Sequence, residues 1–132
     1  MRTLKTLFII AIICFAASYC SAQKTENFKT FWKSFVTDSV FQKERTHFPL
    51  TFTYSQSGEI EEEHDDMITE EVSADDWNFL ILESQYSKNK FKKENALYIV
   101  EEIGIENGIY ITYTFAATDG KWYLVRIVDL SM

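Results

Sequence analysis

The sequence has few of the residues on which cross-linked or loop-dominated proteins depend. Its two cysteines, Cys14 and Cys20, both lie in the first twenty of 132 residues. The rest of the chain therefore has no disulfide bond, no thiol nucleophile and no thiolate metal site. One proline and four glycines leave little room for a glycine-rich phosphate loop. No serine-hydrolase or zinc-hydrolase spacing occurs either, so we predict no catalytic residue, no metal site and no cofactor.

Positive charge is also scarce. Thirteen basic residues stand against twenty acidic ones, which gives a formal net charge of −7. A negative surface disfavours nucleic acid and anionic membranes, whose phosphates reward basic proteins. We therefore expect a small-molecule or protein partner, and not nucleic acid.

A long apolar run occurs only at the N-terminus. Arg2 and Lys5 precede an almost unbroken apolar stretch from residue 7 to residue 17, and small residues then lead to Ala22. This pattern is typical of a secretory signal peptide, and the run is short for a membrane span. We predict a signal peptide over residues 1–22, cleaved after Ala22, and an exported protein, periplasmic or extracellular.

An alternative end of the leader is Cys20, which would become a lipidated first residue. Tyr19 stands where that motif expects a small residue, which argues against lipidation. Residues 23–132 are then a single α+β domain, with no transmembrane segment and a net charge of −9 once the two basic residues of the leader are removed. Without a disulfide, its hydrophobic core must hold it together.

Aromatic residues dominate the start of this domain. They recur at the spacing of one helix face, which predicts an amphipathic helix packed on a core. The face consists of Phe28, Phe31, Trp32, Phe35 and Val36. Thr37 or Asp38 can cap a second, shorter helix that continues to Arg45. We expect Pro49 to end it, because the residue before a proline avoids helical geometry.

The periodicity changes to two after the proline, which predicts a strand from Leu50 to Tyr54. Farther along, Ser73 or Asp75 can cap a helix, and a strand over 77–83 is the alternative. The sequence SKNKFKKEN, residues 87–95, is interpreted as a basic polar connection.

Three β-rich runs fill the last third of the domain, over 97–103, 109–117 and 122–130. The pairs Asn107-Gly108 and Asp119-Gly120 separate them and favour tight hairpin turns. In the last run, alternation places Tyr123, Val125 and Ile127 against the helices. It leaves the opposite face, with Trp122, Leu124 and Val128, uncovered.

Helices followed by antiparallel strands predict an α+β domain with its helices on one face of the sheet. The motif FxxFWxxFxxDxxFQxxRxxFPL, the central DDW and the closing KWYLVRIVD resemble the exported bacterial family known as domain of unknown function 4348. The pattern is carried by Phe28, Phe31, Trp32, Phe35, Asp38, Phe41, Gln42, Arg45, Phe48, Pro49, Leu50, Asp76, Trp77, Trp122, Leu124, Ile127 and Asp129.

That resemblance implies a nuclear-transport-factor-2-like cone, in which a curved, mostly antiparallel sheet wraps a long helix and leaves a pocket at its open end. The superfamily includes isomerases, dehydratases and pure binding or dimerisation modules, so the fold alone selects no function. Steroid-isomerase-type members use a Tyr and an acid pair. Tyr110, Tyr113 and Asp129 are the nearest equivalents here, and they match no motif residue by residue.

Two arginines stand in apolar surroundings and need acidic partners if they are buried. Arg45 lies between Phe41 and Phe48, Arg126 lies between two aliphatic residues, and Asp38 or Asp129 can pair with them. The structural interpretation is an ion pair that joins helix to sheet, and the functional one is a cation that holds an anionic ligand. The predicted ligand-binding residues are Tyr110, Tyr113, Trp122, Arg126, Arg45 and Asp129.

The remaining charged features are interpreted as structural. The acidic sequence EIEEEHDD at 59–66 lacks calcium-loop spacing, so a solvated edge strand is the preferred interpretation over a metal site. His47, before Phe48-Pro49, is placed at a helix end, where a cation interacts favourably with the dipole. Four lysines at 88, 90, 92 and 93 either neutralise the acidic stretch or form a surface for head-to-tail association.

The preferred function is a secreted, non-catalytic module that binds a ligand or another protein. The alternative is a small isomerase or dehydratase, with Tyr113 or Tyr110 as proton donor and Asp129 or His47 as base. We also predict a homodimer through the uncovered face of the last strands, with Arg126 bridging to an acidic residue of the second copy.

Overall fold

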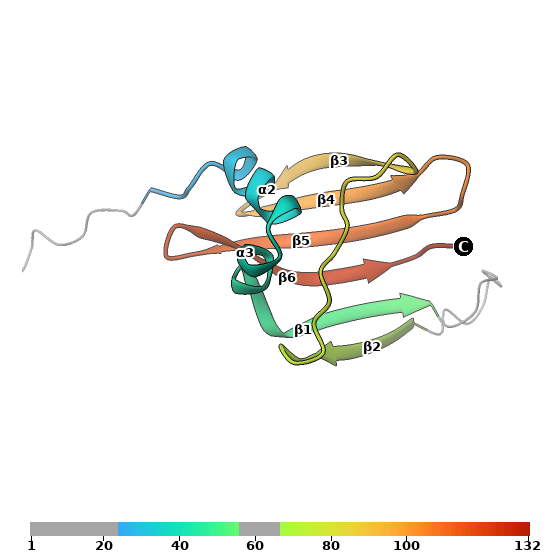
Figure 1. The fold of residues 1–132 in the computed structure, drawn as a ribbon, viewed down its shortest axis with the longest axis horizontal. Coiled ribbons are helices and arrows are strands. Elements are labelled where there is room, and N and C mark those ends of the chain that lie inside the picture. The colour runs from blue at the N-terminus through green and yellow to red at the C-terminus, as the bar shows by residue number, and fades with distance from the viewer. Residues whose placement is uncertain (1–23, 56–66) are drawn as a thin grey trace, which may run out of the picture.

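The computed structural model describes residues 24–55 and 67–132, so the predicted signal peptide and the acidic sequence 59–66 lie outside the described residues. Two helices, α2 (Phe28–Thr37) and α3 (Ser39–Glu44), precede six strands. The strands are β1 (Thr46–Ser55), β2 (Met67–Val72), β3 (Ser87–Glu94), β4 (Leu97–Gly104), β5 (Tyr110–Thr118) and β6 (Lys121–Asp129). Both helices lie on one face of the sheet, which we call the inner face (Figure 1).

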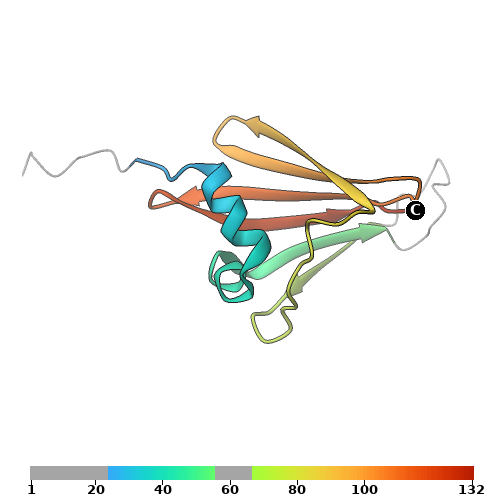
Figure 2. The same ribbon diagram turned by 45° about the horizontal axis from the view of Figure 1, so that its top comes forward.

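The sheet has the strand order β2-β1-β6-β5-β4-β3. All neighbouring pairs are antiparallel except β1 and β6, which are parallel. The sheet curves around the helices, as Figure 2 shows. This arrangement confirms the predicted α+β class, with N-terminal helices on a curved, mostly antiparallel sheet.

The aromatic face of α2 forms the centre of the core, as predicted. The helix buries Phe28, Phe31, Trp32 and Phe35. The ring of Phe115 on β5 contacts all four, with centroid distances from 5.2 to 6.0 Å. Such edge-on ring pairs add specific geometry to the burial of large apolar surfaces.

Polar caps set the ends of both helices. The Asn27 side chain accepts a hydrogen bond from the backbone N–H of Thr30 at 3.1 Å and begins α2. Of the two caps predicted for α3, the structure uses Asp38, whose carboxylate accepts bonds from the N–H groups of Val40 and Phe41, both at 3.0 Å. These bonds satisfy backbone donors that have no partner within a helix.

Pro49 does not end the second helix, and this prediction was wrong. Helix α3 ends at Glu44, and β1 already begins at Thr46 and runs through the proline. The register of β1 against β6 shifts between Thr46 and Thr51, so Pro49 lies at an irregularity where no regular ladder bond is needed. His47 is accordingly an exposed strand residue, with its ring 4.9 Å from that of Tyr123, and not a helix end.

The three C-terminal runs form β4, β5 and β6, as predicted. At the β5–β6 turn Asp119 and Gly120 both have positive φ angles, 50° and 74°, which a two-residue hairpin requires. Between β4 and β5 the connection is longer, and Glu106 and Gly108 have positive φ angles there.

Residues 77–84 form neither the helix nor the strand predicted for them. After a turn at residues 73–76, they run as an extended segment across the inner face of the sheet (Figure 1). We call residues 77–84 the strap. Gln42, which is fully buried, holds it: Nε2 donates to the carbonyl of Leu80 at 3.1 Å, and Oε1 accepts from the Leu80 N–H at 2.7 Å. Leu82 then enters the core.

The basic sequence at 87–94 is strand β3, so its interpretation as a connection was wrong. It pairs along its whole length with β4 and is one edge of the sheet. Its alternating lysines suit an edge strand, because charge opposes pairing with other chains. The acidic strand β2 is the opposite edge, so neighbouring strands do not bring Glu70 and Glu71 to the lysines.

The two faces of β6 differ from the prediction because the strand contains a β-bulge. Thr114 pairs with Arg126, but the next residue, Phe115, pairs with Leu124, so β6 has one extra residue, Val125. A bulge of this kind reverses the alternation of side chains on one side of it. Leu124 and Trp122 are therefore in the core, 0% and 5% exposed, and not on the uncovered face.

Candidate binding groove

A groove of about 400 Å³ lies between α2, β3, β4 and the end of the strap. We call it the aromatic groove. It is lined by Phe28, Lys29, Trp32, Lys33, Glu83, Phe91 and Tyr98. Its volume lies within the range of small-molecule sites, which are mostly apolar and contain a few polar groups.

Four aromatic rings form the walls of the groove. Phe28 and Trp32 project from successive turns of α2, and Phe91 and Tyr98 come from the paired strands β3 and β4. The rings of Phe28 and Tyr98 are stacked, with centroids 4.0 Å apart and planes at 4°. Trp32 meets Phe91 edge to face at 5.2 Å. The two helix rings are held in the core, whereas Phe91 is 48% exposed and available to a ligand.

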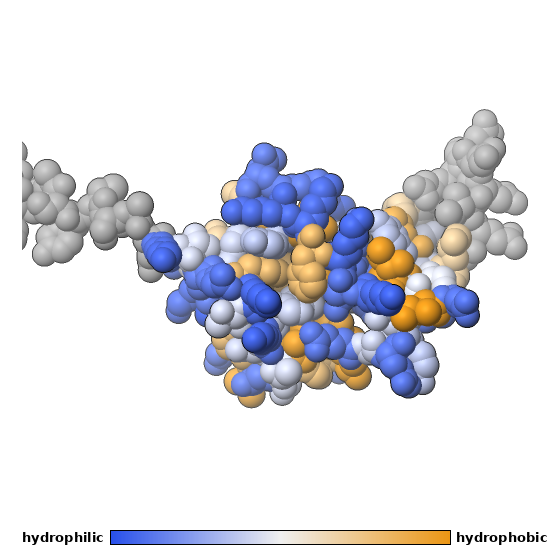
Figure 3. Space-filling model, turned by 90° about the horizontal axis from the view of Figure 1, so that it is seen from above, coloured by the Kyte–Doolittle hydropathy of each residue, from blue (hydrophilic) through white to orange (hydrophobic). Residues whose placement is uncertain are grey.

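Positive charge surrounds these rings. Lys29 and Lys33 lie one turn apart on α2, and the Lys93 amine lies 6.0 Å from the Tyr98 ring centroid. Glu83, on the strap, is the one acidic residue in the lining. Figure 3 views the molecule from above its orientation in Figure 1, with hydrophilic residues covering much of the surface around smaller hydrophobic areas. The groove thus combines an apolar body with a cationic rim.

The structure separates the predicted site residues onto two faces. Tyr113 and Trp122 are buried on the inner face. Tyr110, three residues before Tyr113, lies on the outer face, where its hydroxyl donates to Glu101 at 3.2 Å. Arg126 is also on the outer face and exposed. These four side chains do not line one pocket, and a role in ligand binding stays a prediction for each.

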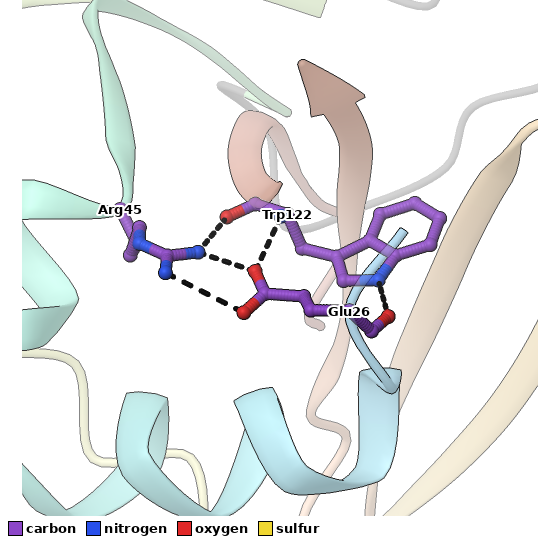
Figure 4. A network of polar contacts seen from close by, with 3 residues as sticks. All are labelled: Glu26, Arg45 and Trp122. Atoms are coloured by element: carbon purple, nitrogen blue, oxygen red, sulfur yellow. Dashed lines mark hydrogen bonds and ion pairs between the residues drawn. The ribbon is translucent and has the colours of Figure 1, made fainter. Parts of the chain in front are cut away.

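Arg45 pairs with neither Asp38 nor Asp129, the partners predicted for it. Its guanidinium forms an ion pair with Glu26, which precedes α2, and donates to the Trp122 carbonyl at 3.3 Å (Figure 4). Glu26 Oε1 also accepts the Trp122 backbone N–H at 2.7 Å, and the Glu26 carbonyl accepts the indole N–H at 3.0 Å.

This network fits the structural interpretation, because it joins the start of α2 to the end of α3 and to β6. Burial by itself would raise the pKa of Glu26, but hydrogen bonds from Arg45 and the Trp122 amide, with the charge of Arg45, lower it below its ordinary value. Arg126, being exposed, needs no buried partner.

A second polar group is buried on the inner face of the sheet. The Tyr113 hydroxyl donates to the buried carboxylate of Glu102 at 2.9 Å, and the Ser87 hydroxyl donates to the same carboxylate at 2.7 Å. Burial, and then the negative charge of Glu102, raise the pKa of the Tyr113 phenol far above its ordinary value. Asp129 adds a smaller effect of the same sign. Neither Tyr113 nor Glu102 lines the aromatic groove.

Another apolar groove, of about 620 Å³, lies between α3 and the start of the strap. Val40, Phe48, Trp77 and Phe79 are its large apolar residues. Its charged residues, Lys43 and Glu44, come from one helix and have opposite signs. This groove therefore offers a ligand little net electrostatic preference.

Sequence reasoning missed the aromatic groove because Phe91, its exposed wall, lies on a strand that was interpreted as a connection. The signal was present: Phe91 is the one large apolar residue among the lysines of β3, with Lys93 two positions farther on the same face. Lys29 and Lys33, which flank the aromatic face of α2, were not among the predicted ligand-binding residues. Alternation on β3 points Phe91 toward the helix.

Neither a metal-binding cluster nor a membrane-spanning helix is found in the described residues. Residues 24–55 and 67–132 contain no group of three or more His, Cys, Asp or Glu side chains placed to hold a metal ion. In the same ranges, no helix has the length and apolar character required to cross a membrane. His64 and its acidic neighbours lie outside the described residues, so their interpretation stays a prediction.

Comparison with known proteins identifies relatives of the fold. A family model described as domain of unknown function (DUF4348) matches residues 4–129. A crystal structure of an NTF2-like protein from Bacteroides fragilis aligns with a TM-score of 0.59 and 22% identity, over 82% of this chain and 48% of that one. This chain thus spans about half the length of that relative.

A second solved structure, an NMR structure of a protein from Bacteroides uniformis, aligns with a TM-score of 0.53 and 23% identity, over 79% of this chain and 76% of the other. At these identities the similarity concerns the fold. No curated protein matches the sequence.

Proposed function

We propose a function from the surface of this chain, which belongs to the family described as domain of unknown function (DUF4348). The protein is an exported, non-catalytic module that binds a small amphipathic molecule in the aromatic groove. The observation that carries this proposal is that two fixed rings, Phe28 and Trp32, and the half-exposed Phe91 line one groove of about 400 Å³. Rings already held by the core cost little entropy on binding, and this favours a flat apolar ligand.

The chemistry of the groove favours binding over catalysis. Its lining contains two lysines, one glutamate and no histidine. A general base must lie within hydrogen-bond reach of a proton on the substrate, and an acid-base pair usually approaches the same point. Glu83 comes from the strap and the lysines from α2, and no hydrogen bond between them is found in the described residues.

The isomerase or dehydratase alternative would use Tyr113 or Tyr110 as proton donor and Asp129 or His47 as base, whereas the carboxylate that Tyr113 contacts is that of Glu102. Tyr113 and Glu102 are both buried, 4% and 6% exposed, so a substrate would reach them only after the segments that cover them moved. Of the other groups considered, Tyr110 lies on the outer face and His47 is an exposed residue of β1. Asp129 is half-buried and accepts the backbone N–H of Ser131 at 2.9 Å. This arrangement supports the binding module.

Export rests on the leader pattern. Cleavage after Ala22 would leave Gln23 as the first residue, whereas lipidation would leave Cys20. Intact mass measurement of the protein recovered from cells distinguishes these two products. A protein that keeps all 132 residues would contradict export through this leader.

We also propose a homodimer that forms through the outer face of the C-terminal strands. Trp122 and Leu124 take no part in it, because both are in the core. Val128 remains there, half-buried, beside the exposed Arg126, which would bridge to an acidic residue of the second copy. Light scattering on residues 23–132 tests the dimer, and Arg126→Glu should weaken it. A wild-type protein that stays monomeric at high concentration would contradict it.

The binding proposal is tested by thermal-shift screening of small amphipathic molecules, followed by a pair of matched variants. Phe91→Ala removes the exposed wall of the aromatic groove and should abolish the shift caused by a bound compound. Phe79→Ala removes an exposed ring from the other apolar groove and should leave that shift intact. If binding survives Phe91→Ala unchanged, the aromatic groove is not the site.

A further inference from the structure

Most of the positive charge after residue 23 gathers on one side of this acidic protein. Six of the eleven basic residues there belong to α2 and β3: Lys29, Lys33, Lys88, Lys90, Lys92 and Lys93. Helix α2 and strand β3 form two sides of the aromatic groove. A local positive field in a chain with a net charge of −7 attracts anions to this side of the molecule.

Only some of these lysines can act on a ligand in the groove. Alternation along β3 places Lys93 on the inner face with Phe91, and places Lys88, Lys90 and Lys92 on the outer face. Lys92 is also paired with Glu94. The cations that remain near the aromatic rings are Lys29 and Lys33 on the helix and Lys93 above Tyr98.

These three amines lack matching negative charge. In the described part of the chain the ion pairs are Arg45 with Glu26 and Lys92 with Glu94, neither of which involves the groove lysines. Glu83 is the single carboxylate in the lining. A ligand that brings an acid group to the rim would therefore meet a net positive charge in surroundings partly desolvated by four rings, where an ion pair is stronger than in open solvent.

We propose that the ligand of the aromatic groove is an amphipathic anion, a flat apolar body that carries a carboxylate, sulfonate or phosphate group held between Lys29 and Lys33. The inference rests on the proposed function and specifies the chemical class of its ligand. The apolar body lies against Phe91 and Trp32, and the acid group lies at the helix rim. Because the amines hold the anion as point charges, the shape of the acid group matters less than its charge.

Two fluorescent probes that differ in a single acid group separate charge from shape. 1-Anilinonaphthalene-8-sulfonate carries a sulfonate, and N-phenyl-1-naphthylamine has the same rings without it. The wild-type protein should bind the anionic probe about tenfold more tightly, since each exposed ion pair is worth a few-fold in affinity. Raising the salt concentration should reduce this preference, because salt screens charges at the surface.

Matched lysine variants locate the preference. Lys29→Gln with Lys33→Gln should weaken the anionic probe about tenfold and leave the neutral probe unchanged. Lys88→Gln with Lys90→Gln removes the same charge from the outer face of β3 and should change neither affinity by more than about twofold. Circular dichroism and thermal melting show whether each variant is folded, because the anionic probe also binds partly folded chains.

The outcomes separate this inference from the function on which it rests. The anion inference is overturned if both probes bind equally well, bind more weakly to Phe91→Ala, and bind with unchanged affinity when Lys29 and Lys33 are replaced. In that case the groove remains a binding site. If neither probe binds, or if Phe91→Ala changes neither affinity, the proposed site itself fails. An equal loss from both lysine pairs would indicate general attraction to the basic side, which also overturns the inference.

Discussion

Gln42 offers the sharpest test of how the strap is held. The side chain is fully buried and makes three hydrogen bonds to backbone: Nε2 donates to the Phe35 carbonyl at 3.0 Å and to the Leu80 carbonyl at 3.1 Å, and Oε1 accepts from the Leu80 N–H at 2.7 Å. Gln42→Met keeps a similar side-chain volume and removes all three bonds. The cost is then due to the unpaired backbone groups and not to a cavity.

The magnitude follows from the number of bonds lost. A buried group left without its partner costs about 1–3 kcal/mol, and the strap can release and rehydrate Leu80, which limits the total. We expect Gln42→Met to lower the free energy of unfolding by about 3 kcal/mol. For a domain near 100 residues this corresponds to a fall in the melting temperature of roughly 15 °C.

Urea unfolding followed by circular dichroism measures this loss, and amide hydrogen exchange at Leu80 reports the strap directly. Lys43→Met is the control, because it places methionine at the next position of α3, which is exposed. It should change the free energy of unfolding by less than about 0.5 kcal/mol. If Gln42→Met is as stable as the wild type and the Leu80 amide keeps its protection, the strap is held by other contacts and this reasoning is refuted.

Three further predictions concern the core and its polar groups. The pKa of Glu26 is lower in the folded protein than its ordinary value of 4.5, so its carboxylate stabilises the fold above pH 4.5 and loses this contribution as the pH falls through the folded pKa. In urea titrations the wild type should be more stable than Glu26→Gln by about 2 kcal/mol at pH 7, the value of a charge-assisted bond, and this difference should shrink toward pH 3. Leu124→Asp places a carboxylate at a fully buried position, so it should lower the free energy of unfolding by more than about 4 kcal/mol and abolish the cooperative thermal transition. A Leu124→Asp protein that remains a folded monomer would contradict the assignment of Leu124 to the core. The Tyr113 pKa is raised, so its phenol should stay protonated in absorbance titrations until the folded protein opens in alkali, and Tyr113→Phe should leave the native titration curve unchanged.

Local features of the fold could be predicted from the sequence because they depend on neighbours along the chain. The face of α2 repeats every three or four residues, Asp38 can cap only the helix that follows it, and Asp119-Gly120 supplies its own turn geometry. Strands β4 to β6 followed from alternation between such turns. Tyr113 and Phe115 are both buried on one face of β5 for the same reason.

The faces of β6 and the nature of β3 depended on pairing between distant segments. Val125 is an extra residue only in relation to β5, so its sequence context gives no sign that the alternation reverses between Leu124 and Ile127. The lysines of β3 look like a solvated connection until β4 supplies a partner for every residue. Propensity is a weak guide where cross-strand contacts decide the structure.

The sequence by itself determined the two N-terminal helices, the C-terminal strands and the aromatic core, because periodic spacing and turn residues act over a few positions. Only the tertiary structure decided where a ligand could bind. The aromatic groove needs Phe28 and Trp32 from α2, Phe91 from β3 and Tyr98 from β4 to meet around one cavity. That meeting depends on the order of strands in the sheet and on the path of the strap, both of which arise from contacts between residues far apart in the chain.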